Sequence, residues 1–348
     1  MKPLVNGNPL IGVWYQPVSS FAKWKSRGIN TLFGYESESG TVSLDAYCTA
    51  AATAGLTVLL QWAPASLSRI KADPNVIGVI NQPDEPDGVG NTPPATMLAN
   101  YQAIKAQTSK PVFLNVDGRK MQWLPASTYA AYAQAADALC FDYYVLNYGE
   151  PVANFPNLTA RAQQLKAAGN GKPVIAIIEC SNQDMAVQAW CAGTPVAAAM
   201  RGPTAAEFQQ EVAAALAGGV DGVAYFPDVI GTNFVSFDGV PADVAAAMTA
   251  QNAQLLAAPA SAPSAASVPP ATPVAPAPTP TTTNPPGHAA SGGNAPAHST
   301  PTVSDAVLSA LKASTVTLTT ADGTQLHLQL VVSAAPAAPS SPSTSTTP

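Results

Sequence analysis

The chain has 348 residues, of which 47% are hydrophobic and only 10% are charged, and its formal net charge is -6 at pH 7. This length supports one large domain or two ordinary ones, with a core that needs no covalent staples. The mildly acidic balance, without a cluster of Lys or Arg, argues against a nucleic-acid partner, and no apolar run reaches the roughly 18–20 residues of a membrane span.

The cysteines and the N-terminus carry few signals. Residues 1–10 lack the apolar core of a signal peptide. The four cysteines fit neither a zinc pattern nor a Cys-x-x-Cys redox motif. Cys48 and Cys140 lie in apolar contexts and are expected to be buried, whereas Cys180 and Cys191 flank one loop and could bridge. No obligatory disulfide is expected.

Histidine provides the sharpest exclusion. All three histidines, His288, His298 and His327, lie in the C-terminal quarter, and the first 257 residues contain none. This removes Ser-His-Asp and Cys-His catalysis, and every imidazole-ligated metal site, from the main part of the chain. Its chemistry must use carboxylates, hydroxyls, thiols or lysines, and no cofactor or metal is expected.

Apolar runs alternate with amphipathic or Ala-rich stretches along the first 257 residues. The predicted strands cover residues 11–15, 31–34, 57–61, 76–81, 112–116, 139–143, 174–178 and 222–226. Most are uniformly apolar, which is typical of a buried parallel sheet. The predicted helices cover residues 18–27, 43–54, 65–71, 96–108, 127–136, 157–168, 204–217 and 242–256.

Several of these helices have start or stop signals. Ser43 is a candidate N-cap, and Thr204 precedes Glu207 in a Thr-x-x-Glu capping box. Eight strand–helix repeats in about 250 residues predict a (β/α)8 barrel. The alternative is a doubly wound open sheet, which normally uses fewer strands and here lacks a Gly-x-Gly-x-x-Gly loop after the first one.

The composition changes abruptly after the barrel. We expect residues 1–257 to form the barrel, 258–301 a Pro/Ala/Thr-rich linker, 302–333 a small element and 334–348 a disordered tail. The small element reads as a short helix at 303–314 and a hairpin at 315–332 that turns at Asp322 and Gly323. It is too small to be stable alone, so it docks, oligomerises or stays partly disordered.

The carboxyl ends of barrel strands carry the functional groups of this fold. Here the residues that follow or end the strands are mostly carboxylates and aromatics: Tyr15, Gln16, Tyr35, Glu36, Gln61, Trp62, Asp84, Glu85, Asp117, Tyr143, Tyr144, Glu179, Tyr225, Phe226 and Asp228. Aromatic rings stack on the C–H faces of sugars, and two carboxyls can cleave a glycosidic bond. The mouth therefore suits a carbohydrate substrate.

The fourth strand ends in Asp84-Glu85-Pro86. This ending resembles the Asn-Glu-Pro or Asp-Glu-Pro of retaining (β/α)8 glycoside hydrolases of the "4/7" superfamily (clan A-like). The segment from Arg201 through Pro203 and Thr204 is similar to one found in uncharacterised glycosidase-like barrels. The resemblance covers residues 10–257 and implies that Glu85 is the general acid/base and that Glu179, at the end of strand seven, is the nucleophile.

Strand alternation also favours Glu179, because Ile175, Ile177 and Glu179 share one face that would lead into the barrel mouth. Asp117 and Asp142 are interpreted as structural. The candidate substrate-binding residues are Asp84, Tyr144, Trp14, Tyr35, Trp62 and Tyr225. Three features depart from the resemblance: Asp84 stands in place of the usual Asn, the strand-eight aromatic is Tyr225 or Phe226 instead of Trp, and some relatives carry Gln at the position of Glu179.

The hypothesis is a glycoside hydrolase that cleaves O-glycosidic bonds of an oligo- or polysaccharide by double displacement. One alternative is a non-catalytic glycan-binding or structural barrel tethered to a cell surface or virion. Another is a lysozyme-like peptidoglycan hydrolase that uses other strand-end carboxylates. The Pro/Thr-rich linker favours an extracellular or surface-associated location, although no signal peptide is visible.

Overall fold

Eight parallel strands close into a barrel in sequence order, with β1 pairing both β2 and β8. The computed structural model describes residues 5–35, 42–88, 91–182, 199–229 and 236–257, together with two strands at 315–319 and 325–329. The barrel strands are β1 (Leu10–Trp14), β2 (Thr31–Phe33), β3 (Thr57–Gln61), β4 (Val76–Ile80), β5 (Val112–Asp117), β6 (Ala138–Asp142), β7 (Val174–Glu179) and β8 (Gly222–Phe226). All eight predicted strands are confirmed, and the open-sheet alternative is wrong.

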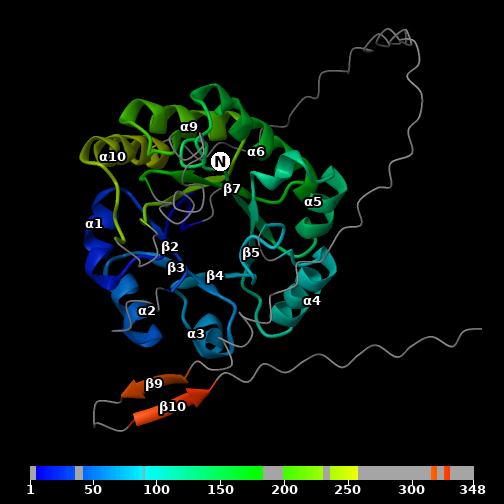
Figure 1. Ribbon diagram of the computed structural model, residues 1–348, viewed down its shortest axis with the longest axis vertical. Coiled ribbons are helices and arrows are strands. Elements are labelled where there is room, and N and C mark those ends of the chain that lie inside the picture. Colours follow the sequence, from blue (N-terminus) through cyan, green and yellow to red (C-terminus); the bar gives the residue numbers. More distant parts are fainter. Residues whose placement is uncertain are drawn as a thin grey trace, which may run out of the picture. The chain divides into compact units, whose positions relative to one another are not determined.

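Helices surround the barrel, as Figure 1 shows. They are α1 (Phe21–Ser26), α2 (Leu44–Thr53), α3 (Leu67–Ala72), α4 (Pro94–Lys105), α5 (Ala126–Ala133), α6 (Pro156–Gly169), α9 (Ala205–Ala217) and α10 (Ala242–Ala257). Short 3-10 turns occur at η1 (Val18–Ser20), η2 (Pro64–Ser66), η3 (Lys120–Gln122) and η4 (Val152–Asn154). Each predicted helix is present, and the fold is a (β/α)8 barrel.

The predicted helix starts depend on particular side chains. Thr204 and Glu207 form the capping box at the start of α9, because each side chain bonds the other residue's backbone N–H. Ser43 caps α2 by accepting a hydrogen bond from the N–H of Ala46 at 3.2 Å. Both caps satisfy N–H groups that the first helical turn leaves without a partner.

Two apolar layers hold the barrel together. One lies between strands and helices and includes Val13, Leu60 and Tyr225, and the other fills the barrel interior and includes Trp14, Phe33 and Phe113. Glycines make room for the interior rings, since a Cβ at Gly12 would lie 2.3 Å from the Phe33 ring. Alternation along each strand therefore decides which residues face the barrel axis.

By its internal contacts the chain divides into two units, Met1–Val268 and Pro269–Pro348. In the second unit, β9 (Thr315–Thr319) and β10 (Gln325–Gln329) pair antiparallel, with Gln325 opposite Thr319. Several expectations lie outside the described residues: the linker, the helix at 303–314, the hairpin turn, the tail, Glu36 and the thiol of Cys191. In the part of the chain that the structure describes, Cys48, Cys140 and Cys180 are buried free thiols, and no helix is long and apolar enough to span a bilayer.

Candidate functional site

The loop after β4 begins the site. Glu85 has a φ of 43°, in the left-handed region that non-glycine residues seldom adopt. Such backbone is retained where the surroundings hold it, often at functional sites. Asp87 supplies part of that support, since its buried carboxylate accepts hydrogen bonds from the N–H of Asp117 and the hydroxyl of Tyr129, both at 2.9 Å. Asp87 therefore anchors the loop that carries Asp84 and Glu85.

Three neighbouring strands bring polar groups together beside this loop. The Asn115 side-chain amide, on β5, lies 3.2 Å from Asp84 Oδ1 and 3.4 Å from Asp142 Oδ2. The Asp142 carboxyl, at the end of β6, also interacts with the Glu85 carboxyl. We call Asp84, Glu85, Asn115 and Asp142 the acidic cluster. It lies at the carboxyl ends of the strands, where this fold carries its functional groups.

Carboxyls in and beside the acidic cluster have raised pKa values, so they keep their protons at pH values at which ordinary carboxyls release them. Burial and, after it, the negative charge of Glu85 raise the pKa of Asp84 to about 7. Burial and the interaction with Glu85 raise the pKa of Asp142 well above its usual range. Burial and Glu85 also raise the pKa of Asp117. Two interacting carboxyls cannot both be ionised cheaply, so Asp142 is the carboxyl that retains a proton beside Glu85.

Aromatic rings line one side of the acidic cluster. Tyr144, two residues after Asp142, stacks on Tyr148 with ring centres 6.0 Å apart and on Phe226 with centres 6.1 Å apart. Burial, then the charges of Asp142 and Glu85, raise the pKa of the Tyr144 hydroxyl. Tyr144 is therefore the one predicted aromatic residue that the structure places beside the carboxyls.

Glu179 occupies a different environment. It has no exposed surface. Its carboxylate accepts hydrogen bonds from the N–H groups of Leu146 and Asn147, each at 2.7 Å, and from the side-chain amide of Asn147. The carboxyl of Glu211 in α9 also acts on Glu179, although neither Glu211 oxygen has a hydrogen-bond partner among the described residues. Strand alternation keeps Glu179 on the face of β7 that carries Ile175 and Ile177, but the amide donors of the loop after β6 bind and cover its carboxylate.

Burial raises the pKa of Glu179, although its hydrogen bonds oppose the shift. Burial and the charge of Glu179 raise the pKa of Glu211 well above its usual range. The two carboxyls form a second acidic pair, between β7, α9 and the loop after β6. Arg201, whose positive charge acts on Glu211, is bound to Glu207 at 2.6 Å.

The other predicted aromatic residues do not join the acidic cluster. Tyr225 is fully buried on the helix-facing side of β8, where its hydroxyl donates to Asn252 at 2.6 Å, so Phe226 faces the barrel interior in its place. Tyr35 packs its ring edge-on against Tyr47 and donates its hydroxyl to a loop carbonyl. Trp62 is half-buried against the outer apolar layer. Trp14 lies inside the barrel, where its buried indole N–H has no hydrogen-bond partner among the described residues.

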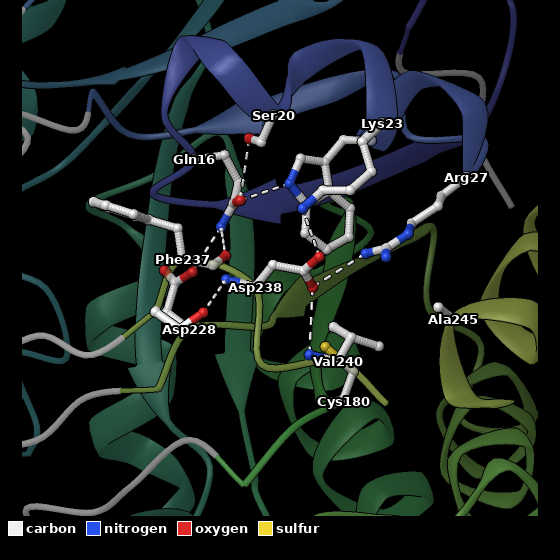
Figure 2. Close-up of polar contacts among 12 residues, drawn as sticks. Gln16, Ser20, Lys23, Arg27, Cys180, Asp228, Phe237, Asp238, Val240 and Ala245 are labelled. Carbon is white, nitrogen blue, oxygen red and sulfur yellow. Dashed lines mark hydrogen bonds and ion pairs between the residues drawn. The ribbon is translucent and has the colours of Figure 1, made fainter. Parts of the chain in front are cut away.

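A buried polar network joins the first and last strands (Figure 2). The Gln16 amide donates to Asp228 Oδ1 at 2.6 Å and to the carbonyl of Phe237 at 2.7 Å, and accepts from the Trp24 indole. Lys23 pairs with Asp238 in the same segment at 2.5 Å. These contacts close the barrel seam, so the two strand-exit residues Gln16 and Asp228 have partners within the scaffold.

Sequence reasoning assigned Asp142 a structural role and did not select Asn115, Tyr148 or Phe226. A signal for Asn115 was present, because it shares the inward face of β5 with Phe113 and a polar residue there needs partners. Asp117 does accept the loop amides of Arg119 and Lys120, at 2.8 and 3.3 Å. Among the described residues, no three His, Cys, Asp or Glu side chains are arranged to hold a metal ion.

A scan against protein-family models matches none, and a search of curated proteins finds no match. Solved structures do resemble the chain. A glucosidase from Croceicoccus marinus has a TM-score of 0.48 at 13% identity, over 73% of this chain and 69% of that one. A GH128 (subgroup I) endo-β-1,3-glucanase from Amycolatopsis mediterranei, in complex with laminaritriose, has a TM-score of 0.44 at 18% identity, over 69% and 98% of the two chains.

A glycoside hydrolase family 17 β-1,3-glucanosyltransferase from Rhizomucor miehei has a TM-score of 0.42 at 16% identity, over 62% of this chain and 85% of that one. At these identities and TM-scores the similarities assign neither an activity nor a substrate to this chain. What they share with it is an arrangement of strands and helices, and the function has to be argued from the acidic cluster itself.

Proposed function

We propose that this protein is a glycoside hydrolase that cleaves O-glycosidic bonds with carboxyl groups at the ends of β4 and β6. The observation that carries the proposal is the interaction between the Glu85 and Asp142 carboxyls, which with burial raises the pKa of Asp142 well above its usual range. A pair in which one carboxyl keeps a proton can supply an acid and a carboxylate, which are the two groups that glycoside cleavage needs. Tyr144 supports the proposal because its ring lies beside the pair and can stack on a sugar.

In this mechanism the entering sugar first displaces the proton from Asp142 to Glu85, and Glu85 then donates it to the glycosidic oxygen as the C1–O bond breaks. The Asp142 carboxylate attacks C1 and forms a covalent glycosyl ester. Glu85, now a carboxylate, takes a proton from water whose oxygen attacks C1, and the ester bond breaks. Retention requires the two carboxyls to lie roughly 5–5.5 Å apart, with C1 between them.

The resemblance to the "4/7" superfamily implies a different nucleophile, Glu179. That assignment requires the loop after β6 to release the Glu179 carboxylate, which three amide hydrogen bonds now hold. The geometry favours Asp142, because Asp142 already contacts Glu85. Both assignments share Glu85 as the general acid/base.

A second candidate function is a non-catalytic glycan-binding barrel. The specific observation in its favour is the full burial of Glu179, whose carboxylate is covered by the loop after β6. Under this alternative the acidic cluster and Tyr144 bind sugar hydroxyls and ring faces without bond cleavage. The acidic cluster is also compatible with a lysozyme-like peptidoglycan hydrolase, which differs from the main proposal in the polysaccharide that it cleaves.

Reducing-end release from a panel of glucans, xylans, chitin and peptidoglycan tests the proposal. We expect cleavage by the wild type, loss of about 10²–10⁴-fold in rate for Glu85→Gln and Asp142→Asn, and a smaller loss for Glu179→Gln. Activity that survives Glu85→Gln would refute the assignment of the acid. Binding without any cleavage by the wild type would support the non-catalytic barrel.

A further inference from the structure

An exposed tryptophan lies on the same end of the barrel as the acidic cluster. Trp123 directly follows η3, in the segment between β5 and α5, and 60% of its surface is exposed. Among the described residues only one other large apolar side chain, Val152, is counted as exposed, at 45%. Leaving an indole in water forgoes the burial that tryptophans normally have in folded proteins.

Trp123 belongs to a continuous row of stacked groups. The Arg119 guanidinium lies 6.0 Å from the Trp123 ring centre and 4.7 Å from the Tyr148 ring centre. Tyr148 stacks on Tyr144 with an angle of 27° between the rings, and Tyr144 stacks on Phe226 with an angle of 24°. We call these five residues the aromatic row.

Two interactions fix Arg119 within the aromatic row, one at its backbone and one at its guanidinium. Its backbone N–H donates to Asp117 at 2.8 Å, and its guanidinium pairs with Glu150 at 4.0 Å. Tyr143 bonds the same Glu150 carboxylate through its hydroxyl, so Glu150 is itself fixed in place. Arg119 is therefore positioned before any ligand arrives, which lowers the ordering cost of binding.

The two ends of the aromatic row differ in environment. Tyr144 lies beside Asp142 and Glu85, whereas Trp123 lies on the surface. Apolar ring faces stack on the C–H faces of pyranoses, and the guanidinium offers donors to hydroxyls between them. The exposed Trp123 ring and the Arg119 guanidinium offer these contacts to sugars beyond the one at the acidic cluster.

We infer that Trp123, Arg119 and Tyr148 form a remote subsite that binds a glycan chain extending from the acidic cluster, so the substrate is an oligo- or polysaccharide and the remote sugars add affinity. The inference rests on the proposed function for the position of the cleaved bond. Trp123 and Arg119 act by binding and take no part in bond cleavage.

The test measures binding in the full-length Glu85→Gln protein, so that cleavage does not interfere. The probes are the disaccharide and the hexasaccharide of β-1,3-glucan, β-1,4-glucan, β-1,4-xylan and chitin, measured by isothermal titration calorimetry. We expect at least one hexasaccharide to bind more tightly than its disaccharide. Trp123→Ala should reduce that gain about tenfold, and Trp123→Phe should restore part of it.

Val152→Ala is the matched control, because it also removes an exposed apolar side chain but lies outside the aromatic row. Val152→Ala should bind the hexasaccharide more tightly than the disaccharide by the same factor as the protein without this substitution. An unchanged gain in Trp123→Ala, or no binding of any hexasaccharide, overturns the inference. The proposed function can fail while this inference holds. The wild-type protein would then cleave none of the probes, and binding of the hexasaccharide would still depend on Trp123.

Discussion

The carboxyl of Asp142, at the end of β6, interacts with the carboxyl of Glu85 in the loop after β4. Asn115, on the strand between them, lies within hydrogen-bond distance of Asp142. Burial and the interaction with Glu85 raise the pKa of Asp142 well above its usual range, which makes this pair the place where acid/base chemistry can occur.

The first prediction concerns loss of the Asp142 carboxyl from the Glu85–Asp142 pair. Asp142→Asn should lower kcat by about 10²–10⁴-fold while KM changes little, because the lost carboxylate acts in the transition state. Steady-state kinetics on the best substrate of the panel measures it. Asp243→Asn, which removes an exposed carboxyl at the start of α10, is the control and should keep wild-type kinetics. Equal kcat values for Asp142→Asn and the control would remove Asp142 from the mechanism.

The second prediction concerns the pH dependence of activity. Asp84 has a pKa of about 7, so it is neutral below that pH and adds a negative charge beside Glu85 above it. The negative charge of Asp84 makes ionisation of Asp142 less favourable. Because the mechanism needs the Asp142 carboxylate, kcat/KM should fall as pH rises through about 7. Asp84→Asn keeps the site neutral and should extend activity to higher pH. The pH profiles of the two proteins give the answer, and superimposable alkaline limbs would exclude a role for the Asp84 charge.

The third prediction concerns stability and the Glu179–Glu211 pair. Both carboxyls have a raised pKa in the folded protein, from an ordinary value of 4.5, so folding holds protons that the unfolded chain releases. The free energy of unfolding should therefore decrease as pH rises above about 4.5 toward the raised values. Glu207 and Arg201, the charged groups that also act on Glu211, are paired with each other.

Glu211→Gln removes one of the two ionisable groups, so its stability should depend less on pH than that of the wild type. Urea unfolding at pH 5 and pH 8 measures the change. Asp243→Asn, which removes an exposed carboxyl at the start of α10, is the control and should keep the pH dependence of the wild type. A pH dependence in Glu211→Gln as steep as in the wild type would show that the pair does not hold the proton.

The fourth prediction concerns the barrel interior. An added methyl group at Gly12 would lie 2.3 Å from the Phe33 ring and 3.2 Å from the Ala224 Cβ. Gly12→Ala should therefore destabilise the protein by about 1–3 kcal/mol, as overpacking of a filled core does. Urea denaturation measures the loss. The double variant with Phe33→Leu should recover part of it, and a strictly additive double variant would indicate that the ring does not cause the strain.

Much of the fold was predictable because it depends on local patterns. Uniformly apolar runs predicted all eight barrel strands, and the Thr204–Glu207 spacing predicted the start of α9, since a capping box is complete within four residues. The order of strands and helices then implied the barrel, because each parallel strand needs a crossover helix to return the chain.

The site was predictable only in part. Asp84, Glu85 and Tyr144 were selected from their places at strand ends, and they do lie together with Asp142. The choice between Tyr225 and Phe226 needed the register of β8, because a shift of one residue exchanges the two faces of a strand.

Glu179 and Asp142 show what the sequence by itself determined and what only the tertiary structure decided. The sequence determined that both carboxyls end a buried strand, because strand patterns are local. Tertiary structure decided that loop amides bind Glu179 and that Asp142 lies beside Glu85 and Asn115. Those partners come from segments far apart in the chain, and a buried carboxyl goes to whichever donors the folded chain brings within reach.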